Sequence, residues 1–198
     1  MIPFGLCVLL ALQAVNAPPM VNRQLIADAE KGDAEAQVKL GRAYAEGLGV
    51  PIDHGKAVVL YRRAADQGHP LGQYLLGWSY LGGEGVDKSD MEGFRWIRKA
   101  AEQGSGEAQV SLAAIYAEGN FGLDEDHRLA FQWSHRAASL GFVAGALQIA
   151  RVYEDGEVLP RDYVLAYAWR SLGGALRVRA VGTADEDDLG ELAQKMTK

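Results

Sequence analysis

A stretch of about 36 residues recurs four times along this 198-residue chain, and it limits the possible folds more than any other feature. Its clearest marker is a tyrosine at the end of a run of small and aliphatic residues. These tyrosines, at spacings of 36, 36 and 37 residues, are Tyr44, Tyr80, Tyr116 and Tyr153. Such a period is typical of repeat proteins, in which each unit packs only against its neighbours.

Each unit is predicted to form two helices. In the first unit, Leu40, Ala43 and Tyr44 share one face of a helix over residues 34–45. A glycine stands at the expected left-handed end of this helix in every unit: Gly47, Gly83, Gly119 and Gly156. The second helix of each unit begins at a residue type that caps first-turn amides: Asp53, Ser89, Asp126 and Asp162.

Small residues recur inside both helices. The first helix carries one at the same position of each unit: Gly41, Gly77, Ala113 and Ala150. A glycine in the middle of a helix costs up to about 1 kcal/mol relative to alanine, so its presence needs a packing reason. We therefore expect the two helix backbones of a unit to approach each other closely at this position.

The sequence thus predicts an all-α fold, a right-handed α-solenoid of four two-helix repeats. The predicted repeats cover residues 32–67, 68–103, 104–140 and 141–176. A stack of this kind leaves an apolar face open at each end. A helix over 22–31 is expected to cap the first repeat, and a helix within 177–198 the last.

The N-terminal segment, residues 1–17, contains no charged side chain and has an apolar run over residues 4–12. That run is shorter than the roughly 20 residues that span a bilayer. It fits a secretory signal that ends in Val-Asn-Ala at residues 15–17. We therefore expect a periplasmic or secreted protein, with no integral membrane span in the mature chain. If the segment is not exported, the protein is cytoplasmic and the segment is an apolar helix packed on the domain.

Charge and cysteine content exclude several function classes. The chain has 26 acidic and 20 basic side chains and a net charge of −6, which argues against nucleic-acid binding and against a basic membrane-binding patch. Its single cysteine, Cys7, permits neither an intramolecular disulfide nor a thiolate zinc site.

Catalytic and cofactor motifs were sought without success. No Ser-x-x-Lys, His-Glu-x-x-His, phosphate-loop or dinucleotide-binding pattern occurs. The four histidines do not have metal-ligand spacing: His54, His69, His127 and His135. The sequence therefore predicts a protein that is not an enzyme and that holds no cofactor or metal.

The repeat resembles the Sel-one-like repeat family, a branch of the tetratricopeptide-type α-solenoids. The resemblance rests on Ala-x-Ala-Gln-x-x-Leu-Gly-x-x-Tyr at residues 34–44, Gly-Leu-Gly-Val at 47–50 and Ala-Ala-Glu-Gln-Gly at 100–104, and it covers about residues 22–176. It implies a curved solenoid that acts as an adaptor or scaffold for other proteins, often outside the bacterial cytoplasm.

The resemblance also implies that the first helix of each repeat lines the concave face. Residues two before and two after the central aliphatic site are then expected to bind a peptide or protein segment. These residues are Val38, Arg42, Tyr74, Trp78, Val110, Ala114, Leu147 and Arg151. They form an apolar row with an arginine near each end, which could receive a partner's carboxylate. Alternatively, Tyr74 and Trp78 pack against a neighbouring repeat.

The predicted function is a non-catalytic adaptor for protein–protein interaction. The alternative is a cell-envelope β-lactam-binding protein or hydrolase built on the same repeats, which the missing cysteines and the missing Ser-x-x-Lys disfavour. A third interpretation is a structural protein of the envelope that binds glycan strands.

Overall fold

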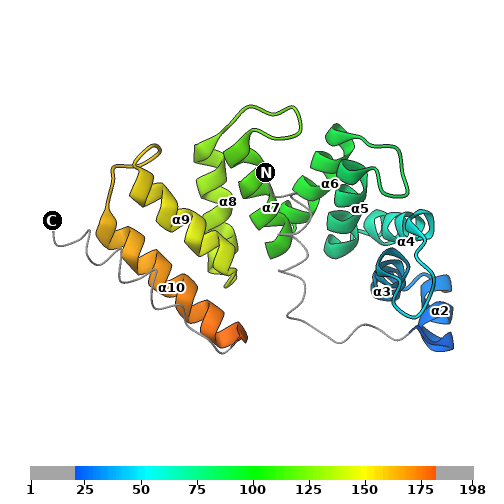
Figure 1. Ribbon diagram of the computed structural model, residues 1–198. Coiled ribbons are helices and arrows are strands. Elements are labelled where there is room, and N and C mark those ends of the chain that lie inside the picture. The colour runs from blue at the N-terminus through cyan, green and yellow to red at the C-terminus, as the bar shows by residue number, and fades with distance from the viewer. Residues whose placement is uncertain (1–20, 182–198) are drawn as a thin grey trace.

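The computed structural model describes residues 21–181, which form an all-α solenoid (Figure 1). The helices of this part of the chain are α2 (Arg23–Glu30), α3 (Ala34–Glu46), α4 (His54–Asp66), α5 (Pro70–Gly82), α6 (Asp90–Glu102), α7 (Gly106–Glu118), α8 (His127–Ser139), α9 (Val143–Asp155) and α10 (Tyr163–Val181). Four helix pairs, α3–α4 to α9–α10, follow the short helix α2. The predicted N-terminal signal and the C-terminal part of the predicted capping helix lie outside the described residues.

The helices begin and end with the capping interactions that their residue types predict. All four first helices end at a glycine with φ between 60 and 73°. At the start of the second helices, the side chains of Asp53, Ser89 and Asp126 each accept a hydrogen bond from the backbone N–H three residues later. These contacts satisfy backbone groups that the helix itself leaves unpaired.

Helix α10 ends beyond the predicted C-terminal boundary of the fourth repeat. It has 19 residues and continues past residue 176, through Gly173 and Gly174. The second helices of the first three repeats end just before a glycine of positive φ: Gly68, Gly104 and Gly141. The equivalent residue of the fourth repeat is Arg177. Because the left-handed stop is missing there, nothing ends the helix at that point.

Close packing explains the small residues inside the first helices. A Cβ atom on Gly77 would lie 2.7 Å from Cγ1 of Ile97 and 2.9 Å from the carbonyl oxygen of Gly93. A Cβ atom on Gly41 would lie 2.6 Å from Cε1 of Tyr61. The backbone of the first helix is therefore in direct contact with the second helix.

In the first three repeats, the sizes of the two facing residues vary together across this contact. The second helix carries a large side chain where the first carries glycine, as in the pair Gly77 and Ile97. In the third repeat the equivalent pair is Ala113 and Ser134, both fully buried. The first helix thus gains a methyl group where its partner side chain is small, which keeps the interface filled.

Buried glutamines join consecutive repeats. In each of the first three repeats, a glutamine amide donates a hydrogen bond to a carbonyl near the end of the preceding helix. The three bonds, of 3.1 to 3.2 Å, are Gln37 to Ala29, Gln73 to Ala65 and Gln109 to Ala101. A second glutamine, near the end of the same repeat, donates to the Oε1 atom of the first in two cases: Gln67 to Gln37 and Gln103 to Gln73.

The glutamine network stops in the third repeat. Leu140 stands where Gln67 and Gln103 stand in the earlier repeats, and the buried Oε1 atom of Gln109 has no hydrogen-bond partner among residues 21–181. In the fourth repeat, Ala146 replaces the first glutamine as well. The boundary between the third and fourth repeats is therefore built without these bonds.

Adding a side chain at the close contact should destabilise the fold. We expect Gly77→Val to lower the free energy of unfolding by about 1–3 kcal/mol, because the new atoms overlap Ile97 and the α6 backbone. Chemical denaturation measures this value. Gly82→Ala, at an exposed site of the same helix, is the control and should change stability little. An unchanged midpoint for Gly77→Val would contradict the close-contact interpretation.

Completing the glutamine network should stabilise the fold. We expect Leu140→Gln to raise the free energy of unfolding by about 0.5–1.5 kcal/mol, because its amide can donate to the unpaired Oε1 atom of Gln109. In a Gln109→Leu background, the same change should give no gain. A gain of equal size in both backgrounds would show that Leu140 acts in another way.

Candidate protein-binding face

The first helices of the repeats lie on the inner side of the solenoid. Besides packing against its sequence neighbours, α3 contacts α5, and α7 contacts α9. Helices on the inside of a curved stack come closer together than those outside, so α3, α5, α7 and α9 line the inner surface. We call the solvent-facing side of these four helices the inner face.

The inner face is formed by four positions of each first helix, spaced four, three and four residues apart. In α3 these positions hold Glu35, Lys39, Arg42 and Glu46. The equivalent residues are Leu71, Leu75, Trp78 and Gly82 in α5, Glu107, Ser111, Ala114 and Glu118 in α7, and Ala144, Gln148, Arg151 and Asp155 in α9.

Charges dominate the two ends of the inner face. In α3, Lys39 pairs with Glu35 at 3.2 Å and Arg42 pairs with Glu46 at 3.2 Å. In α9, Arg151 pairs with an aspartate one turn later, at 3.3 Å. Exposed pairs of this kind stabilise a helix only slightly. They do, however, occupy the arginines that were expected to receive a partner's carboxylate.

A polar link crosses from α3 to the start of α5. The Nδ1 atom of His69 accepts a hydrogen bond from the backbone N–H of Gly72 at 3.3 Å, and Nε2 lies 3.0 Å from a carboxylate oxygen of Glu35. Partial burial raises the pKa of Glu35, but the hydrogen bonds from His69 and Lys39 outweigh it and hold the pKa below its usual value. Glu35 is thus kept ionised at the edge of the inner face.

An apolar strip occupies the centre of the inner face on α5. Leu71, Leu75 and Trp78 are partly exposed and follow one another at helical spacing. The Trp78 ring packs edge-on against Tyr74, with ring centroids 6.3 Å apart. This apolar strip, defined as Leu71, Leu75 and Trp78, contains no charged side chain.

Carboxylates flank the apolar strip on the α7 side. Glu107 accepts a hydrogen bond from the hydroxyl of Ser105, and Glu118 accepts one from the amide of Asn120. Neither carboxylate forms an ion pair within residues 21–181. Over the whole inner face there are five carboxylates and three cations, and each cation is paired within its own helix.

The predicted binding residues fall into two groups. Arg42, Trp78 and Ala114 are partly exposed on the inner face, and the Arg151 side chain is 79% exposed. The other four residues lie two positions before the aliphatic site: Val38, Tyr74, Val110 and Leu147. Of these, Val110 and Leu147 are partly exposed.

Two of the predicted residues are buried in the core. Val38 is 1% exposed and Tyr74 is 4% exposed, so neither presents appreciable surface to a partner. The Tyr74 hydroxyl lies 3.2 Å from the hydroxyl of Ser111 on α7, and burial raises the pKa of its phenol. For Tyr74, the structure therefore agrees with the alternative of packing against a neighbouring repeat.

Leu71 and Leu75 were missed by sequence reasoning. They lie seven and three residues before Trp78, which is the spacing of one helix face. The prediction instead chose the residues two before and two after the aliphatic site. The residue after the site lies on the inner face, and the residue before it lies at the edge of that face.

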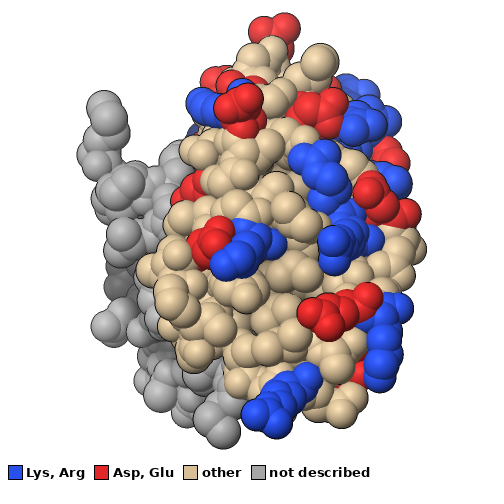
Figure 2. Space-filling view, turned by 90° about the vertical axis from the view of Figure 1, so that its right-hand side faces the viewer, with Lys and Arg blue, Asp and Glu red and all other residues tan. Residues whose placement is uncertain are grey.

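Other kinds of site find no support in the described residues. No group of three or more His, Cys, Asp or Glu side chains within 21–181 is arranged to hold a metal ion. In the same range, no helix is both long and apolar enough to cross a membrane. Seen from its α2 end, the surface carries basic and acidic side chains side by side, with no area of a single sign (Figure 2).

A family model described as "Sel1 repeat" matches the chain at residues 34–69, 70–105, 106–142 and 143–169. It has the same period as the predicted repeats and starts each unit two residues later. No curated protein matches the chain.

The solved structures similar to this protein include two that are described with the same repeat or fold. A Sel1 repeat protein from Oxalobacter formigenes is 29% identical, with a TM-score of 0.72, and the match covers 83% of this chain and 72% of that one. The protein c5321, a protective antigen present in uropathogenic Escherichia coli strains and displaying an SLR fold, is 33% identical, with a TM-score of 0.74. That match covers 88% of this chain but 40% of the antigen, so this chain spans less than half of the antigen's length.

Proposed function

Because the chain belongs to the Sel1 repeat family, whose helical solenoids typically mediate protein interactions and are generally non-catalytic scaffolds, we propose that it is a protein-binding adaptor. It binds a segment of another protein along the inner face of α3, α5 and α7. The apolar strip on α5 is the observation that carries this proposal.

The distribution of apolar and polar residues on the inner face resembles that of a protein-binding surface. Protein interfaces combine an apolar centre with a polar rim, and tryptophan is enriched among the residues that contribute most to affinity. Here the apolar strip is bordered by the ion pairs of α3 and by the carboxylates of α7. A partly exposed tryptophan at the middle of a curved array is well placed to anchor a partner.

The charges of the inner face favour a particular partner chemistry. Arg42 and Arg151 are paired within their own helices, whereas Glu107 and Glu118 form no ion pair in the described part of the chain. The proposed partner segment therefore has apolar side chains for the strip and a lysine or arginine beside them. Opposite charge at the rim of an interface contributes mainly to association rate and specificity.

Removing the Trp78 side chain should weaken binding without unfolding the protein. We expect Trp78→Ala to lower affinity for the natural partner at least tenfold, as for a residue that dominates an interface. The measurement is affinity purification from the source organism with the tagged chain, followed by titration with the partner identified. Met91→Ala, which removes an exposed apolar side chain from α6, is the matched control.

Two results would reject the binding face. Either Trp78→Ala retains full affinity while its circular dichroism is unchanged, or Met91→Ala weakens binding to the same degree. Substituting Glu118→Lys tests the charge preference, because it should weaken a partner with basic side chains and should not affect a neutral one.

The adaptor is proposed to act outside the cytoplasm. Residues 1–17 have the apolar composition of a secretory signal, as described above. We expect N-terminal sequencing of the protein purified from the cell envelope or medium to begin at Pro18. Recovery of the protein from the cytosol with residues 1–17 intact would reject this localisation.

A further inference from the structure

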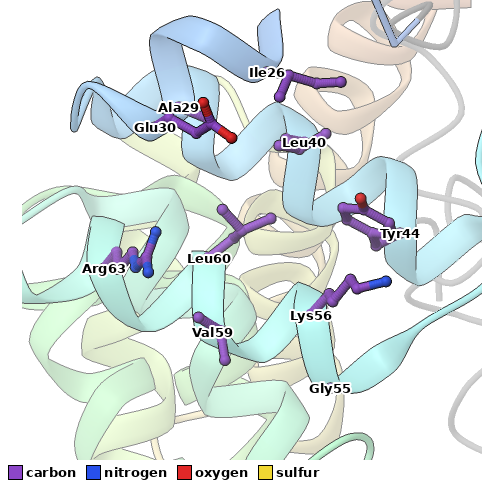
Figure 3. Close-up of a pocket in the computed structure, with 10 residues that line it drawn as sticks. All are labelled: Ile26, Ala29, Glu30, Leu40, Tyr44, Gly55, Lys56, Val59, Leu60 and Arg63. Atoms are coloured by element: carbon purple, nitrogen blue, oxygen red, sulfur yellow. The ribbon is translucent and has the colours of Figure 1, made fainter.

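A cavity of about 330 Å³ opens between α2 and α4 on the side of α3 opposite the inner face (Figure 3). Leu40 and Tyr44 of α3 line it together with Leu60 of α4. Around them, Ile26 is 37% exposed and Val59 is 52% exposed. The cavity is therefore apolar inside and open to solvent.

The first repeat departs from the others at several positions around the cavity. In the second repeat, the equivalents of Ile26, Gly55 and Leu60 are Arg62, Met91 and Trp96. Trp96 is 8% exposed and packs in one cluster with Ala65 and Leu76, while Arg62 covers the Tyr80 ring at 5.5 Å. Because Met91 is 77% exposed, the space in the first repeat arises mainly from Ile26 and Leu60 in place of Arg62 and Trp96.

In the second and third repeats, the tryptophan in this groove is accompanied by a cation. In the second repeat, the Lys99 ammonium lies 5.0 Å from the ring centre of Trp96. In the third, the Arg136 guanidinium lies 4.5 Å from that of Trp133. A cation over an indole face is attracted to the electron density of the ring.

The first repeat has the cation without the tryptophan. Arg63 occupies the position of Lys99 and Arg136 and lines the cavity beside Leu60 (Figure 3). Its side chain forms no ion pair, hydrogen bond or ring contact with the described residues. The Arg63 guanidinium therefore lies where a cation–π pair would form if an indole ring occupied the cavity.

We infer that this cavity is a second binding site, which takes a tryptophan side chain from a segment of a partner protein. The indole occupies the volume that Trp96 and Trp133 fill in the following repeats, and Arg63 lies over its face. The neighbouring repeats supply the template for both the shape and the charge. Because the site lies away from the inner face, it is independent of the proposed adaptor surface.

The test uses a ligand that mimics a tryptophan within a chain. N-acetyl-L-tryptophanamide is titrated into the ¹⁵N-labelled full chain, and amide chemical shifts are followed. We expect saturable shifts confined to α2, α3 and α4, with a dissociation constant of about 1 mM or tighter. N-acetyl-L-leucinamide should bind at least about fivefold more weakly, because it forms no cation–π contact and fills less of the cavity. Absence of saturable shifts at these helices, or equal affinity for both compounds, would overturn the inference.

Two variants separate the cavity from non-specific binding. Leu60→Trp should fill the space with the side chain that later repeats use, abolish the shifts and leave the melting temperature the same or higher. Arg63→Gln should weaken binding about two- to fivefold. Arg128→Gln, at an exposed residue of α8, is the control for the loss of a positive charge and should leave affinity unchanged. Full binding in either cavity variant would count against the site.

Two further arms identify the source of the indole and separate the two proposals. Free L-tryptophan should bind more weakly than N-acetyl-L-tryptophanamide. If free L-tryptophan binds more tightly, the occupant of the cavity is a small-molecule ligand and not a segment of a partner protein. Trp78→Ala should leave the titration unchanged. Loss of the shifts in that variant would show that the two surfaces are not independent.

Discussion

The hydrogen bond from a buried glutamine amide to a carbonyl of the preceding helix fixes how one repeat is placed on the next. Gln37, Gln73 and Gln109 are nearly inaccessible to solvent, with exposures of 2%, 0% and 5%. A buried amide that loses its partner costs about 1–3 kcal/mol, so a shift between repeats is strongly disfavoured. Apolar packing alone lacks this directionality. The curvature of the solenoid, and with it the arrangement of the inner face, depends on these bonds.

Within a repeat, contact between helix backbones has the complementary role. Gly41 and Gly77 bring the first helix directly against the second, and the size of the facing residue varies to match. The two helices of a repeat therefore form one closely packed unit. One side of each first helix is committed to this contact, which leaves the opposite side free to form the inner face.

Much of the fold could be predicted from the sequence because residues with the same structural role recur at the same position of each repeat. Recurring tyrosines, stop glycines and capping residues gave the helices from α3 to α9 and the all-α solenoid. The extension of α10 was missed, although Arg177 in place of a glycine was a readable signal. The binding face was less predictable. Whether a residue such as Tyr74 faces solvent or the next repeat depends on the rotation of one helix against another, which the period does not encode. The cavity beside Leu60 was missed because it arises where the first repeat departs from the others at several positions.

The fourth repeat is attached to the third by different means. Ala146 cannot form the amide bond, and the ring of Phe142 lies against Gly106 in the place where the first boundary has the link between His69 and Glu35. Apolar contact is less directional than a hydrogen bond, but this boundary is closely packed: a Cβ atom on Gly145 would lie 2.6 Å from the carbonyl oxygen of Ser134. The fourth repeat is thus placed on the third by shape, through close contact between the α8 and α9 backbones. A side chain added at Gly145, rather than the loss of a hydrogen bond, is therefore the change that would shift α9 and its inner-face residues relative to α7.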